Sequence, residues 1–171
     1  PYEVATKLWL IPGAITGVIF PALTTARFQE GNRSTEIFDM GVRATVFGVL
    51  PIVLVLAAFA PEGLDLWLGA EFARESAAVL RWLAVGVLVN SVGQVAGAAV
   101  QAAGRPDLTA KLHAAEFPLY VAGLWWLVGS YGLVGAAIAW MLRVTLDTGV
   151  LLAMSVRLLP GRSVAGRAAI L

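Results

Sequence analysis

The stretch GRPDLTAKLHAAEFPLYVAGLWWLVGSYGLVGAAIAWMLRVTLD, residues 104–147, decides what kind of protein this chain can be. It consists of two long apolar runs on either side of Tyr131–Gly132, and it carries four ionisable residues inside them: His113, Glu116, Arg143 and Asp147. Each charge at the centre of a membrane helix costs roughly 2.5 to 3.5 kcal/mol on the insertion scale, so an ionisable residue there is a functional-site hypothesis by default.

The composition of the whole chain agrees with a membrane setting. Apolar residues make up 59% of the chain and charged residues 13%, with a mean hydropathy of +0.82, whereas soluble domains carry about 25% charged residues. We therefore predict an all-α integral membrane protein. The net charge of +1 gives no basis for nucleic-acid binding, and the absence of cysteine excludes disulfides and thiolate metal sites. Because the chain begins at Pro1 without a leader pattern, we expect it to be a piece of a longer protein.

Apolar segments of about 20 residues match a hydrocarbon core of about 30 Å. Five such spans are predicted within a transmembrane lobe of residues 1–160, at about 7–26, 44–60, 77–103, 111–130 and 133–156. The polar stretch 27–43 is interpreted as a connection. Residues 62–75 alternate apolar and acidic side chains at helical spacing, which predicts a short interfacial helix, and residues 161–171 are expected to form a flexible cytoplasmic tail.

Lysine and arginine are unevenly distributed between the two sets of predicted connections. Eight fall on one side (Arg27, Arg33, Arg43, Arg105, Lys111, Arg157, Arg162 and Arg167) and three on the other (Lys7, Arg74 and Arg81). Since cytoplasmic loops carry the excess of basic residues, we predict a cytoplasmic C-terminus. Five of the six tryptophans (Trp9, Trp67, Trp82, Trp125 and Trp126) then fall toward the outer interface, as an aromatic belt would.

Amide side chains form a row along the predicted span 77–103. Asn90, Gln94 and Gln101 stand at i, i+4 and i+11, with Gly97 at i+7, so one face of the helix is polar or small. The row either lines a cavity or forms hydrogen bonds between helices, which use the same residue types.

The ionisable residues of 104–147 allow alternative interpretations. Arg143 and Asp147, four residues apart, form either an internal salt bridge or a cavity wall on which the arginine receives an anionic group. His113 and Glu116 share a face with Thr109 and are expected near the cytoplasmic surface, as an interfacial pair or as part of proton coupling. Glu116 is also a candidate for the wall of a substrate cavity. Arg143 and Asp147 are expected near the midplane, away from that pair.

Enzyme signatures are not found in the sequence. It has no glycine-rich phosphate loop, no H-E-x-x-H, no G-x-S-x-G and a single histidine. We predict that the protein is not an enzyme and has no cofactor or metal, with proton or sodium coupling left open.

With these segments placed, the chain resembles the C-terminal half of a polysaccharide-export flippase of the multidrug, oligosaccharidyl-lipid and polysaccharide exporter superfamily. The resemblance lies in LIPGAITGVIFPALTTA (10–26), APEGLDLWLGAEFARESAAVLRWLAVG (60–86), QAAGRPDLTAKLHAAEFPLY (101–120) and GLVGAAIAWMLRVTLD (132–147).

The resemblance implies a two-lobed fold, of which this chain supplies five of six helices in the second lobe, and alternating access around a central cavity. It further implies a bacterial inner-membrane transporter that flips a polyprenyl-diphosphate-linked oligosaccharide for lipopolysaccharide or another polysaccharide. Its partners are then the bilayer, the missing N-terminal lobe and enzymes of glycan synthesis. Two alternatives stay open: a cation-coupled multidrug exporter of the same fold, and a membrane scaffold for glycan synthesis that transports nothing.

Overall fold

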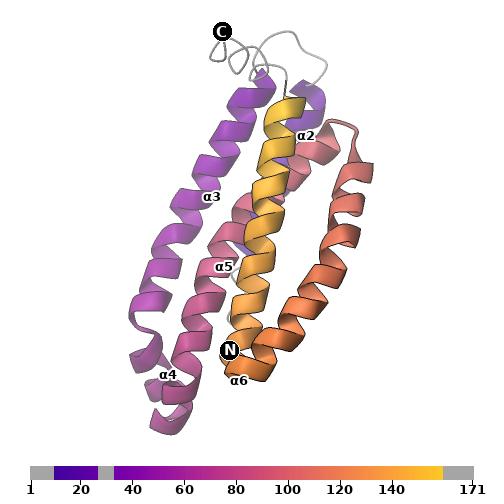
Figure 1. Cartoon of the computed structure of the whole chain (residues 1–171). Helices are drawn as coiled ribbons and strands as arrows, with labels where there is room; N and C mark the ends of the chain where they lie inside the picture. The colour runs from indigo at the N-terminus through magenta and orange to yellow at the C-terminus, as the bar shows by residue number, and fades with distance from the viewer. Residues whose placement is uncertain (1–9, 27–32, 160–171) are drawn as a thin grey trace, which may run out of the picture.

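The computed structural model describes residues 10–26 and 33–159, and within these ranges the chain is helical without strands. The helices are α2 (Leu10–Ala26), α3 (Arg33–Ala58), α4 (Ala60–Leu68), α5 (Ala70–Ala102) and α6 (Pro106–Leu158). The long helices run side by side, with the short α4 at one end of the bundle (Figure 1). The prediction of an all-α protein is confirmed.

Helix α5 is the centre of the bundle, because it packs against all four other helices. Its residues Val95, Ala96, Ala99 and Val100 are almost completely buried among apolar side chains of α2, α3 and α6. Small residues on α5 allow this close approach. A Cβ added at Gly86 would overlap the ring of Trp140, so glycine is required where α6 crosses.

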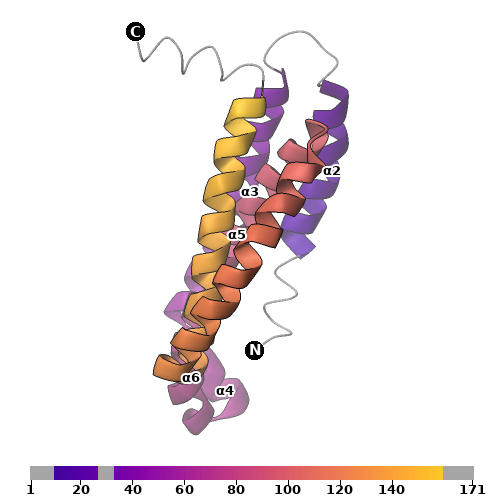
Figure 2. The same ribbon diagram turned by 45° about the vertical axis from the view of Figure 1, so that its right-hand side comes forward.

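Helix α6 folds back on itself at Gly132, where the backbone has φ 58° and ψ −133°. A side chain is strained in this conformation, and glycine adopts it readily. The 53 residues of α6 are thereby divided into two arms, 106–131 and 133–158, of 26 residues each. At about 1.5 Å per residue each arm is about 39 Å long, enough to cross a bilayer. Figure 2 shows the hairpin that the arms form.

Helix α3 begins earlier than the sequence analysis expects. Residues 33–43 are its first turns and not a connection, and the helix continues to Ala58. The interpretation of this part of 27–43 as a loop is wrong because its charges lie on one exposed face, while Ser34, Phe38 and Gly41 lie on the buried face. A polar helical extension of an apolar span has this pattern. Residues 27–32 lie outside the described ranges.

The single interfacial helix expected over 62–75 is also wrong. The chain breaks at Gly69, with φ 90° and ψ 161°, so residues 60–68 form α4 and residues 70–75 begin α5. Leu64 of α4 is buried against Ala73 and Ala77 of α5, whereas Leu66 is 93% exposed. Helix α4 therefore keeps the amphipathic character that the sequence predicts.

The connection between α5 and α6 is a Schellman turn around Gly104. Gly104 has φ 75°, the Arg105 N–H donates to the Val100 carbonyl at 3.2 Å, and the Gly104 N–H donates to the Gln101 carbonyl at 2.8 Å. These bonds satisfy carbonyls at the end of α5, and the Arg105 side chain then pairs with Asp107 at 3.0 Å. The turn lies at the opposite end of the bundle from α4 and from the fold-back of α6 (Figure 1).

By length and composition, α3, α5 and α6 are each able to cross a membrane, and a shorter apolar helix covers Pro12–Ala26. Large apolar side chains are exposed on the outside of the bundle, among them Phe47 at 75% and Trp125 at 82%. Such surfaces suit lipid and not water. The chain is thus a multi-pass membrane protein, while the number of crossings and the tail 161–171, outside the described ranges, stay predictions.

Candidate functional site

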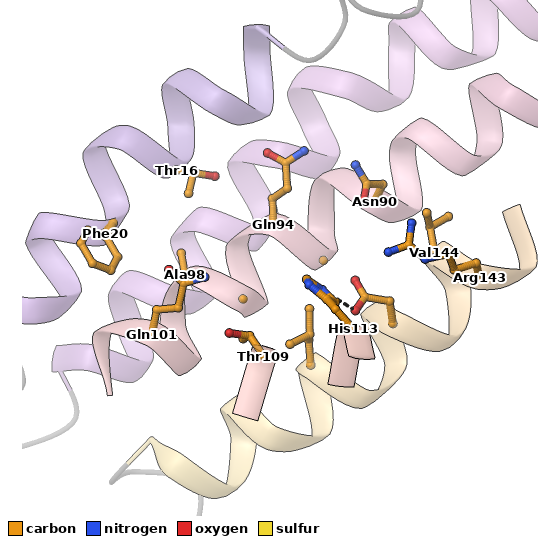
Figure 3. A pocket seen from close by; sticks show the side chains of 14 residues that line it. Thr16, Phe20, Asn90, Gln94, Ala98, Gln101, Thr109, His113, Arg143 and Val144 are labelled. Atoms are coloured by element: carbon orange, nitrogen blue, oxygen red, sulfur yellow. Dashed lines mark ion pairs between the residues drawn. The ribbon is translucent and has the colours of Figure 1, made fainter. Parts of the chain in front are cut away.

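A cavity of about 430 Å³ lies between α2, α5 and the two arms of α6. It contains most of the polar residues that the sequence analysis singles out (Figure 3). Its walls are formed by Thr16, Phe20, Asn90, Gly93, Gln94, Gly97, Ala98, Gln101, Thr109, His113, Arg143, Val144, Asp147 and Leu151. Of the predicted site residues, Glu116 alone is not part of this wall.

The amide row of α5 forms one wall of the cavity. Asn90, Gln94 and Gln101 all line it, and Gly97 lies between them on the same face. None of the three amides has a hydrogen-bond partner among residues 10–26 and 33–159. The alternative in which the row joins helices by hydrogen bonds therefore has no support in the described part of the chain.

A hydrogen bond does join α5 and α6, but its donor is not one of the predicted site residues. The Thr148 hydroxyl donates to the Val89 carbonyl at 3.1 Å, beside Gly93, where an added Cβ would overlap the threonine. Nothing in the spacing of Thr148 distinguishes it from Thr145, whose hydroxyl donates to Met141 of its own helix. The sequence therefore offers no signal for this contact.

The ionisable residues form two ion pairs that cross between the arms of α6. His113 Nε2 lies 3.2 Å from Asp147 Oδ1, and Arg143 Nε lies 3.8 Å from Glu116 Oε2. No Arg143–Asp147 pair is found among the described residues, so the alternative of an internal salt bridge in one helix is wrong. The fold-back at Gly132 brings the two arms together and offers each residue a partner on the opposite arm.

The expectation that these residues form two sites at different depths is also wrong. Ion-pair contacts require His113 and Glu116 to lie at the same level as Asp147 and Arg143. Glu116 does not extend to a polar surface either, since the residue is 8% exposed. Both of its carboxylate oxygens lack a hydrogen bond within the described ranges, and so does Asp147 Oδ1.

A second, smaller crevice of about 190 Å³ lies between the two arms. It is lined almost wholly by apolar atoms, with Glu116, Tyr120 and Arg143 as its polar residues. Arg143 belongs to the walls of both the crevice and the cavity. Its guanidinium carbon lies 5.4 Å from the centroid of the Tyr120 ring, within the range of a cation–π contact. The sequence places Tyr120 on the same helical face as Glu116, but its contact with the opposite arm depends on the hairpin.

The side chains of this site are suited to bind a ligand through hydrogen bonds and charge. Amides donate and accept hydrogen bonds, as a sugar hydroxyl requires, and arginine offers five donors suited to phosphate or carboxylate oxygens. Among the residues that the structure describes, no group of three or more acidic or histidine side chains could hold a metal ion.

The chain is similar to a protein of Shigella flexneri described as "Putative O-antigen transporter", with 34% identity over 148 residues. The similarity covers 86% of this chain and 35% of the relative, so the chain spans about a third of the length of that protein. No protein-family model and no solved structure matches the chain. The resemblance to polysaccharide-export transporters is thereby confirmed: over most of its length this chain is similar to about a third of a protein described as an O-antigen transporter.

Proposed function

We propose that this chain is part of a membrane transporter that moves a lipid-linked oligosaccharide across the bacterial inner membrane by alternating access. The observation that carries the proposal is the cavity, in which amides of α5 without a hydrogen bond to any described residue face the ion pairs of α6. The name of the Shigella relative supports a glycan as cargo.

The two walls suit the two ends of such a substrate. Asn90, Gln94 and Gln101 offer hydrogen bonds to sugar hydroxyls, and Arg143 offers a fork of donors to the diphosphate that joins sugar to lipid. The cavity of about 430 Å³ falls within the range of about 300 to 1,000 Å³ typical of small-molecule sites. The transporter has no need of a metal or organic cofactor in this scheme, and Glu116 and His113 are the residues through which protons would be coupled.

The distribution of charges supports a cytoplasmic location for one end of the bundle. Arg33, Arg105 and Arg157 belong to the end that holds the Schellman turn, whereas Arg74 and Arg81 belong to the first turns of α5 at the opposite end. The positive-inside rule then places the Schellman turn in the cytoplasm and α4 at the outer surface.

Complementation by the full-length protein tests the proposal. In a strain that lacks its own flippase, Gln94→Leu should reduce surface polysaccharide strongly, because leucine keeps the volume and removes the hydrogen bonds. Thr145→Val is the matched control, since Thr145 is exposed and bonds within its own helix. Wild-type polysaccharide in Gln94→Leu at equal membrane levels would refute glycan recognition by this wall.

The same strains separate the competing interpretations. A multidrug exporter would restore drug resistance without restoring polysaccharide. A scaffold that transports nothing would not restore polysaccharide in a strain without a flippase, whether or not Gln94 and Arg143 are replaced.

A further inference from the structure

Arg143 is the residue that separates the polar cavity from the apolar crevice of α6. Its side chain is 34% exposed, and it lines both spaces. Its guanidinium donates no hydrogen bond to any residue of the described ranges, and its ion-pair contact with Glu116 measures 3.8 Å. That distance is too long for a hydrogen bond.

The Arg105–Asp107 pair in the same chain shows the geometry of an arginine that is hydrogen-bonded to a carboxylate. Arg105 donates from Nε at 3.0 Å and from a terminal nitrogen at 3.3 Å to the two oxygens of one carboxylate. Arg143 makes neither bond. Its pairing with Glu116 is therefore a contact between charges, which leaves the five donors of the guanidinium available to another anion.

The buried Glu116 carboxylate needs the nearby positive charge of Arg143, whereas the partly exposed Arg143 guanidinium does not need Glu116. The carboxylate is buried and has no hydrogen-bond donor within the described ranges. Arg143 is its ion-pair partner, and Asp147, on the same arm as Arg143, adds a like charge in the neighbourhood. If Arg143 turned away, the buried carboxylate would lose its ion-pair partner, and a buried carboxylate without such a partner takes up a proton in preference to staying charged.

We propose that Arg143 exchanges partners: it neutralises Glu116 while the cavity is empty and moves to the diphosphate of an entering ligand, and Glu116 then binds one proton from the cavity. In this exchange the Glu116 carboxylate binds one proton and becomes a carboxylic acid. Arg143 keeps its charge, and no bond of the ligand breaks. This inference rests on the proposed function for the identity of the ligand, and on the geometry of Arg143 for the exchange.

Other groups near Glu116 fit this scheme. The Arg143 guanidinium lies over the Tyr120 ring, and this cation–π contact uses none of its N–H donors in a hydrogen bond. His113 is half-exposed and pairs with Asp147, so it offers a route for the proton from the cavity. The cavity walls contributed by α2 and α5 hold amides, hydroxyls and apolar groups, and among the residues that the structure describes they add no further titratable side chain.

Calorimetry on the full-length protein in lipid nanodiscs tests the exchange. Farnesyl diphosphate and inorganic diphosphate are titrated at pH 7 in two buffers of different ionisation enthalpy, with neutral farnesol as the control. We expect the wild type to bind farnesyl diphosphate with uptake of about one proton, and farnesol to give no uptake. Binding of inorganic diphosphate with the same uptake would also support the exchange and would identify the diphosphate as sufficient.

The variants make the result specific. Glu116→Gln should bind farnesyl diphosphate about tenfold more tightly and without proton uptake, because Arg143 no longer has to leave a carboxylate. Arg143→Lys should bind this ligand more weakly but should keep the proton uptake. Glu75→Gln, which replaces an exposed carboxylate of α5 outside both the cavity and the crevice, is the matched control and should keep the uptake too. Equal proton uptake in the wild type and in Glu116→Gln would overturn the proposal, because the comparison of the two proteins cancels any proton that the diphosphate itself gains or loses. Glu116→Asp keeps a carboxylate at this position and should retain the uptake; loss of uptake in Glu116→Asp as well as in Glu116→Gln would show that packing, and not the carboxylate, is responsible.

The outcome is independent of the test of transport. Proton-linked diphosphate binding in a protein that restores no polysaccharide would refute the transport function and leave the exchange standing. Restored polysaccharide in a protein without proton-linked binding would refute the exchange alone.

Discussion

Replacing Gly135 by alanine should destabilise the α6 hairpin. Just past the turn, a Cβ at Gly135 would lie 3.0 Å from the Val128 nitrogen and closer still to the Leu127 carbonyl. Carbon atoms prefer separations of about 3.5 to 4.0 Å, so the arms must separate by on the order of 1 Å. Backbone atoms cannot turn aside as a flexible side chain does, and the added methyl group must therefore be accommodated by the arms themselves.

The expected magnitude follows from two opposing effects. Overpacking costs about 1 to 3 kcal/mol, and the exchange of glycine for alanine in a helix returns up to about 1 kcal/mol. A net loss of about 1 to 2 kcal/mol in the free energy of unfolding is therefore expected.

Gly129→Ala is the matched control, because an added Cβ there meets nothing within 4 Å. Its free energy of unfolding should stay the same or rise by up to about 1 kcal/mol. Denaturant unfolding of the full-length protein in mixed micelles, followed by tryptophan fluorescence, measures both variants. If Gly135→Ala were as stable as Gly129→Ala, the close packing of the arms would be refuted.

Three further predictions concern single contacts. Thr148→Val should lower the free energy of unfolding by about 0.6 kcal/mol, the average for hydrogen bonds between membrane helices, because it removes the bond to Val89; no change in the same assay would show that the bond contributes nothing. The chain contains no cysteine, so Gln94→Cys should react with a water-soluble thiol reagent in membranes, while Val95→Cys, at a fully buried position, should not; equal labelling would contradict a water-filled cavity. Arg81→Gln should cost about 0.5 to 1 kcal/mol, because the arginine donates to a carbonyl at the end of α3 at 3.0 Å; Arg81→Lys should retain part of this, and equal loss in both would argue for packing in place of capping.

The composition and the helical period of the sequence predict the parts of the site that depend on one helix at a time. Asn90, Gln94 and Gln101 share a face because residues three, four, seven and eleven apart always do, and the structure places them on one cavity wall. The tight turn at Tyr131–Gly132 is likewise a local feature, which only glycine accommodates easily.

The pairing of charges could not be predicted in the same way. Arg143 and Asp147 satisfy the spacing for a pair within one helix, yet each has its partner on the other arm. The partners depend on the register of the hairpin, which Gly132 and the close contact at Gly135 determine together. The beginning of α3 could not be predicted for a related reason. The average polarity of residues 33–43 does not show that one face of the helix, beginning at Ser34, is buried.

The crossed ion pairs of α6 bear on how the hairpin enters a membrane during synthesis. An arm inserted alone would expose its charged groups to lipid, and each such group costs roughly 2.5 to 3.5 kcal/mol at the centre of a helix. When both arms enter together, Arg143 and Glu116 already face each other, and Asp147 lies beside the His113 ring. The unit of membrane integration is then the hairpin as a whole, and translation must pass Asp147 before either arm is released into lipid.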